Sequence, residues 1–112
     1  MNLPNAHLAV VEQEKVCGYL FNPAHPDNGG KAEFFLALGF RGEEWRSLAA
    51  ALRQLAESSP VAKSLASTHG AKYVLDGRIR SPGGKTPWVR TVWIVDQGAP
   101  TPRLVTAYPH QD

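Results

Sequence analysis

The spacing of apolar residues changes near residue 70. Up to residue 60, apolar side chains recur every three to four positions, which is typical of amphipathic helices. This spacing predicts three helices: the first begins near Glu12 and stops at Asn22, the second runs from about Lys31 to Gly39, and the third runs from Glu43 to about Ser58. Residues 61–69 are expected to add one or two further helical turns.

From residue 70 onward, apolar and polar side chains approach the alternation of β-strands. Three strands are predicted, over residues 71–80, 86–96 and 102–108, with a hairpin loop between the first two. The middle strand is apolar on both faces, as in the centre of a sheet, and Gly77 marks a bulge or a close approach of another segment. The expected fold class is α+β, with N-terminal helices packed on one face of a C-terminal three- to four-stranded antiparallel meander.

The length of 112 residues suits one hydrophobic core, so we expect a single domain over 1–112, helical at 1–60 and a β-meander at 70–109. A hydrophobic fraction of 43% with 20% charged residues is ordinary for a soluble globular protein. The single cysteine, Cys17, excludes an internal disulfide and is expected to be a buried, unreactive thiol. No apolar run approaches the ~18 residues of a membrane span, and no signal-peptide pattern occurs, so a cytoplasmic location without a membrane partner is predicted.

Charge is divided unevenly between the two halves of the chain. Residues 1–60 carry five Lys and Arg against seven acidic residues, whereas residues 61–112 carry seven against three. A basic sheet half favours an anionic partner on the sheet, although scattered, solvated charge explains the same numbers. The overall net charge of +2 is too small to indicate nucleic-acid binding by itself.

Several kinds of site are absent from the sequence. It has no Gly-rich phosphate loop of standard spacing, no paired Cys or His at metal-ligand spacing and no Gly-x-Ser-x-Gly nucleophile turn. The four histidines are scattered along the chain. We therefore expect no cofactor and no metal site.

His25 and Lys31 form the first candidate for chemistry. Lys31 follows two glycines and opens a predicted helix, where backbone N–H groups favour an anion. His25 lies in the preceding loop, which can fold back beside it, and histidine is suited to proton transfer near neutral pH. The alternative is a plain loop histidine and a surface lysine.

Arg90 forms the second candidate, because it lies in the middle of a strand that is otherwise apolar on both faces. A guanidinium at such a position needs either a carboxylate partner, for which Asp76 is available, or an anionic ligand. Thr91, Thr106 and Tyr108 add hydroxyls that suit a phosphate or a proton transfer. Arg78, Arg80 and Arg103 are expected to bind substrate at the rim; these residues with Lys85 also suit a nucleic-acid binder that does not cleave.

The order of motifs along nearly the whole chain resembles a family of small, uncharacterised bacterial proteins. The motifs are LPNA, K-x-x-x-YLFNPAHP, GKAEFF and LGF, followed by KYVLDG, VRTVWIV and PRLVTAYP. Members often occur beside a second small gene, so the resemblance implies a toxin–antitoxin arrangement with a small cognate antitoxin or immunity protein as partner.

The order of helices then meander, with the closing VTAYP strand, also resembles the metal-independent RNases that include barnase, EndoU, the tRNase colicins and the RelE-type toxins. Carried over by position, this resemblance implies a helix-side role for Lys31 or His25 and strand-side roles for Arg90, Thr106 and Tyr108. The chain departs from many of these enzymes because no histidine lies within its predicted strands. The general base therefore stays open between His25 and Tyr108.

Together these features lead to a toxin-type, metal-independent endoribonuclease as the first hypothesis. It would cleave RNA, either tRNA or ribosome-bound mRNA, by transesterification to a 2′,3′-cyclic phosphate, with Lys31 and Arg90 holding the charge on the phosphate. The alternative is a non-catalytic protein-interaction module of a two-gene, toxin–antitoxin-like system. In that case Arg90 pairs with Asp76, and Lys31 and His25 are dispensable.

Overall fold

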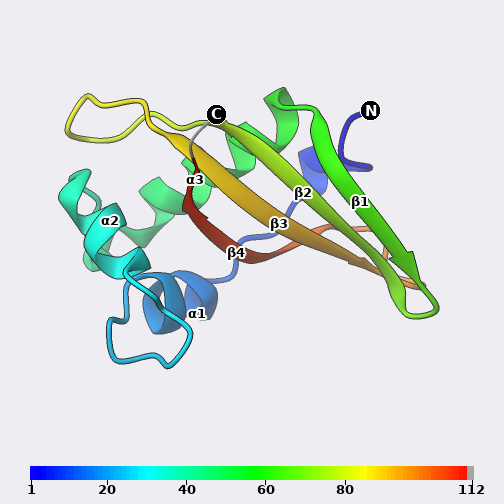
Figure 1. Ribbon diagram of the computed structural model, residues 1–112, viewed down its shortest axis with the longest axis horizontal. Helices are drawn as coiled ribbons and strands as arrows, with labels where there is room; N and C mark the ends of the chain where they lie inside the picture. The colour runs from blue at the N-terminus through cyan, green and yellow to red at the C-terminus, as the bar shows by residue number, and fades with distance from the viewer. Residues whose placement is uncertain (111–112) are drawn as a thin grey trace.

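The computed structural model describes residues 1–110, and in this part of the chain helices precede a four-stranded sheet (Figure 1). The helical elements are η1 (Ala6–Leu8), α1 (Gln13–Lys15), the π-helical turn η2 (Val16–Leu20), α2 (Lys31–Ala37), η3 (Gly42–Glu44) and α3 (Trp45–Ser58). The strands are β1 (Val61–Ser67), β2 (Gly70–Arg78), β3 (Trp88–Asp96) and β4 (Arg103–Pro109). Neighbouring strands are antiparallel in the order β1-β2-β3-β4, so the predicted α+β fold with a C-terminal meander is confirmed.

Helix α3 covers one face of the sheet. Its apolar stripe is buried, with Leu48 and Leu52 fully enclosed, and it packs towards Trp93 and Leu75 of the two middle strands. The pairing of β2 with β3 runs without interruption through Gly77, so this glycine marks a close approach and not a bulge. A Cβ atom there would meet side chains of α3 and of the residue that follows it.

The prediction of helical turns over residues 61–69 is wrong, because residues 61–67 form β1. This strand pairs along its length with β2 from Ser67–Gly70 to Val61–Leu75, and nearly all of its side chains are exposed. Ala, Lys and Leu favour helix locally, but a helix here has little apolar surface to bury. The unpaired edge of β2 offers backbone hydrogen bonds instead, and these determine the structure of the segment.

The chain begins beside β1, where Asn2 bridges to Pro60, and from Val10 onward it lies along β4 at the opposite edge of the sheet (Figure 1). Val10 forms a parallel bridge to Arg103: its N–H donates to Pro102 O at 2.8 Å, and its carbonyl accepts from Leu104 N–H at 3.0 Å. Helices α1 and α2 then contact β4 further along. The sheet face that carries Arg90 is left partly open beside these helices.

Candidate functional site

The loop between η2 and α2 is fixed by one buried side chain, Asn28. Its amide nitrogen donates to the carbonyls of Tyr19 and Leu20 at 2.7 and 3.2 Å, and its amide oxygen accepts from Ala32 N–H at 3.0 Å. A single residue thus satisfies the last carbonyls of η2 and a free N–H in the first turn of α2. This bonding sets where the loop presents His25 and Lys31.

Lys31 lies between that loop and β4. Its ammonium donates to the carbonyls of Asp27 and Asn28 at 3.0 and 3.1 Å. The same nitrogen lies 5.6 Å from the ring centroid of Tyr19 and 5.8 Å from that of Tyr108. An ammonium has three N–H donors, so one remains for a further acceptor beside Tyr108.

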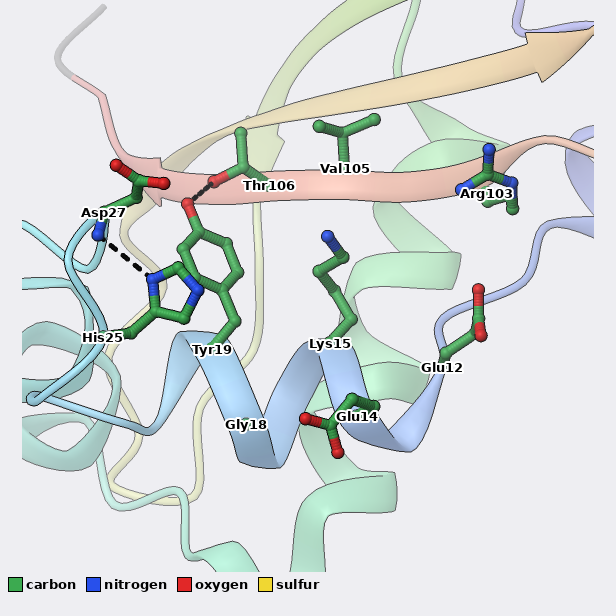
Figure 2. A pocket seen from close by; sticks show the side chains of 10 residues that line it. All are labelled: Glu12, Glu14, Lys15, Gly18, Tyr19, His25, Asp27, Arg103, Val105 and Thr106. Atoms are coloured by element: carbon green, nitrogen blue, oxygen red, sulfur yellow. Dashed lines mark hydrogen bonds between the residues drawn. The ribbon is translucent and has the colours of Figure 1, made fainter.

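His25 packs edge-on against Tyr19, with ring centroids 4.9 Å apart. Its Nδ1 accepts a hydrogen bond from Asp27 N–H at 3.0 Å, as Figure 2 shows. A neutral imidazole that accepts at Nδ1 carries its proton on Nε2, so the ring offers Nε2–H as a donor. In this arrangement Nε2–H can donate a hydrogen bond to a ligand oxygen.

Tyr19 and Thr106 join η2 to β4 through their hydroxyl groups, which lie 2.7 Å apart (Figure 2). Beside this pair is an open cavity of about 610 Å³ between α1–η2, the His25 loop and β4. Lys15 extends from α1 towards β4 in this cavity, with its ammonium 5.3 Å from the Tyr19 ring centroid. Arg103 closes the far end and is paired with Asp96 at 2.9 Å.

Arg90 is held by Asp76 in a two-pronged ion pair, Nε to Oδ1 at 2.7 Å and a terminal nitrogen to Oδ2 at 2.8 Å. The hydrogen bond from Arg90, together with the charges of Arg90 and His110, lowers the pKa of Asp76 even though burial opposes this. The bond to Asp76 likewise raises the pKa of Arg90, and Tyr108 adds to that rise. His110 Nε2 lies 3.5 Å from both Asp76 Oδ2 and the guanidinium.

Contacts therefore link five of the predicted site residues along β4. His25 contacts Tyr19, which bonds Thr106; Lys31 lies against Tyr19 and Tyr108; and Tyr108 is paired with Arg90 across the strands.

Of the remaining arginine candidates, Arg80 and Arg103 are separated from this group, whereas Arg78 lies two residues from Asp76 on β2 and so shares its sheet face. Arg78 lies over the Trp88 ring at 5.3 Å, and Arg80 lines a different cavity of about 270 Å³ beside α3. Arg103 lines the large cavity from the other end of β4. Thr91 is fully buried and bonded within the core, so its hydroxyl does not face a ligand.

Sequence reasoning missed Lys15, Tyr19 and His110. Tyr19 falls at an apolar position of the first predicted helix, and His110 is one of the four scattered histidines. Contacts between distant parts of the chain bring Tyr19 and His110 to the site. The Tyr19 hydroxyl bonds that of Thr106, and the pairing of β4 with β3 continues to His110, whose backbone N–H donates to Trp88 O at 3.1 Å. No local pattern marks such contacts.

Neither a metal cluster nor a membrane span occurs among the described residues. Within 1–110, no three His, Cys, Asp or Glu side chains gather closely enough to hold a metal ion. Over the same residues, no helix combines the length and the apolar character needed to cross a bilayer.

Fold and site together define a small α+β protein with cations and hydroxyls gathered along one edge strand of an antiparallel sheet. The chain belongs to the family described as "Domain of unknown function (DUF6883)", whose model matches residues 2–111. This agrees with the resemblance of its motifs to an uncharacterised family.

A comparison with curated proteins found no match. Among solved structures, the chain is similar to one described as "Contact-dependent growth inhibition toxin - immunity protein complex from Klebsiella pneumoniae 342". The TM-score is 0.73 at 19% sequence identity, over 96% of this chain and 97% of that chain. At this identity the likeness concerns the fold.

Proposed function

We propose that this protein is a toxin-type, metal-independent endoribonuclease whose site lies along β4. The observation that supports it most is the position of Lys31, which brings the His25 loop against Tyr108, the cross-strand neighbour of Arg90. Two cations, a histidine and two hydroxyls from distant parts of the sequence are thereby close to one strand. Such a group suits a phosphodiester, on which negative charge develops during transfer.

The reaction is an internal transesterification. The ribose 2′-oxygen bonds to the adjacent phosphorus, the bond from phosphorus to the 5′-oxygen breaks, and a 2′,3′-cyclic phosphate remains. Tyr108, as the phenolate, takes the proton of the 2′-hydroxyl, and His25, as the imidazolium, gives the Nε2 proton to the leaving 5′-oxygen. The imidazolium carries a proton on Nδ1, so in this step Nδ1 gives up the hydrogen bond that it accepts from Asp27 N–H. Lys31 and Arg90 stabilise the charge on the phosphate, and Thr106 donates a hydrogen bond to one of its oxygens.

The toxin assignment is supported by the solved structure of similar fold, which is described as a toxin–immunity protein complex. By analogy, this chain has a small cognate antitoxin or immunity protein, and tRNA or ribosome-bound mRNA is its substrate. A partner that covers the basic edge of β4 would block the site directly.

The second candidate is a non-catalytic protein-interaction module. Two observations favour it: Asp76 already satisfies Arg90, and β1 presents a free strand edge on which Leu65 is 65% exposed. In this case the partner adds to the sheet or covers Leu65, and the loop residues serve only to hold the fold.

The test compares purified wild-type protein with Lys31→Met and Arg90→Lys on total RNA and tRNA in EDTA. Lys63→Met is the matched control, because it removes an exposed lysine on β1, at the other edge of the sheet. Cleavage by wild type and control, with a loss of about 100-fold or more in both site variants, is expected. Equal cleavage by all four proteins would point to contamination. No cleavage by folded wild type, with ribosomes also supplied, would favour the interaction module.

A further inference from the structure

The cavity between α1–η2 and β4 contains a cation that the proposed reaction does not use. Lys15 is half-buried, and its ammonium lies against the Tyr19 ring and faces Val105 and Thr106 across the groove (Figure 2). Within residues 1–110 the ion pairs join Arg90 and His110 to Asp76, and Arg103 to Asp96. Lys15 takes part in none of them.

Glu12, Glu14 and Asp27 also line the cavity, and Figure 2 shows Asp27 at its His25 end, on the other side of the Tyr19 ring from Lys15. Glu14 is folded back over Gly18, where a Cβ atom would collide with its carboxylate, and Figure 2 shows it pointing away from β4. Glu12 lies at the Arg103 end of the groove. The Lys15 ammonium therefore lies against an aromatic face, which stabilises a cation but does not neutralise its charge.

Lys15 and Lys31 both contact the Tyr19 ring, at 5.3 and 5.6 Å, but only Lys31 also reaches Tyr108. Thr106 and Tyr108 are two residues apart on β4, a separation of about 7 Å along an extended strand. Two positive groups thus lie along β4, Lys15 in the cavity that Thr106 lines and Lys31 beside Tyr108.

We propose that Lys15, held against the Tyr19 ring in this cavity, forms a second phosphate subsite for the RNA chain, next to the scissile phosphate. This inference rests on the proposed function and deepens it, because it makes the substrate an RNA strand laid along β4. The flanking phosphate binds in the cavity, and the scissile phosphate binds beside Lys31 and Tyr108. Lys15 contributes affinity and takes no part in bond breaking.

The experiment measures kcat/KM for three substrates: a dinucleoside monophosphate, and the same dinucleotide with an added phosphate at either its 5′ or its 3′ end. The variant is Lys15→Met, which keeps the side-chain stem on Tyr19 and removes the charge; the matched control is Lys63→Met. We expect wild type to prefer one of the extended substrates by about tenfold, the preference to vanish in Lys15→Met, and cleavage of the dinucleoside monophosphate to stay unchanged. The salt dependence of kcat/KM for the preferred substrate should also fall by about one unit of slope.

An equal loss on all three substrates, or no loss on any, would overturn the subsite while leaving the RNase proposal intact. If wild type cleaves no RNA, the RNase proposal fails, and the subsite is then judged by binding of a 2′-deoxy trinucleotide, which has no 2′-hydroxyl to react. Weaker binding by Lys15→Met than by Lys63→Met supports the subsite, and equal binding overturns it. Thermal melting of each variant checks that the fold is retained.

Discussion

A buried hydrogen bond in the core allows a quantitative test of the strand register. Thr91 and Trp93 are both fully buried on the face of β3 that packs on α3. The Thr91 hydroxyl donates to Leu75 O at 3.0 Å and accepts from the Trp93 indole N–H at 2.8 Å. Replacing Thr91 with Val keeps the shape of the side chain and removes both bonds.

The expected cost follows from the group left without a partner. A buried N–H without an acceptor costs about 1–3 kcal/mol. The methyl that replaces the hydroxyl recovers about 0.8 kcal/mol of apolar burial. Thr91→Val should therefore lower the free energy of unfolding by about 1–2 kcal/mol, or the melting temperature by roughly 4–10 °C for a chain of this size. Valine is a good strand former, so strand propensity alone predicts no loss.

The assay is urea unfolding of four proteins: wild type, Thr91→Val, Trp93→Phe and the double variant. In the Thr91→Val protein the indole N–H has already lost its acceptor. Trp93→Phe should therefore lower the free energy of unfolding by about 1 kcal/mol less in that protein than in wild type. Additive costs, or a Thr91→Val protein as stable as wild type, would refute the register of β3 and the burial of this pair.

Three further outcomes follow from the site. The pKa of Asp76 is lowered in the folded protein, so the ionised carboxylate stabilises the fold above pH about 4. This stabilisation is lost as the pH falls through the folded pKa, and the unfolding free energies of wild type and Asp76→Asn should therefore converge in acid. Asn28→Asp should lower the free energy of unfolding at least as much as Asn28→Ala does, by about 2 kcal/mol or more, as measured by thermal melting. The reason is that a carboxylate cannot donate to the two carbonyls that the Asn28 amide now bonds. Tyr19→Phe and Thr106→Val should each cost about 1 kcal/mol and the pair no more than about 1.5, since they break the same hydroxyl contact; fully additive losses would contradict this.

The sequence pattern was sufficient for those parts of the fold that are locally determined. Helix α3 and strand β3 each have a strong apolar period, and both occur close to where the spacing predicts. Strand β1 could not be predicted in the same way, because its composition favours helix and only pairing with β2 makes it a strand. Thr91 was offered as a ligand-facing hydroxyl because β3 is apolar on both faces, and alternation alone did not reveal which face α3 covers.

The candidate site shows the same division. Lys31 and Arg90 were found because a lysine at a helix start and an arginine in an apolar strand are unusual locally. Asn28 has no unusual local context, because a segment of Pro, Gly and Asn simply predicts a turn. The role of Asn28 depends on its hydrogen bonds to η2 and α2, which are not evident from the sequence. His110 likewise could not be assigned to the site from the sequence, because only the pairing of β2, β3 and β4 brings Asp76 and Arg90 beside it.

The most direct test of the central claim uses an RNA substrate that wild-type protein cleaves in EDTA. A single 2′-deoxy nucleotide is placed on the 5′ side of the cleaved bond, and the products of both substrates are analysed for their end groups. The account predicts a 2′,3′-cyclic phosphate from the all-ribose substrate, no cleavage at the 2′-deoxy position, and a matching loss for Lys31→Met but not for Lys63→Met. Cleavage that persists at the 2′-deoxy position, or that leaves a 5′-phosphate, would contradict an attack by the ribose hydroxyl at this site.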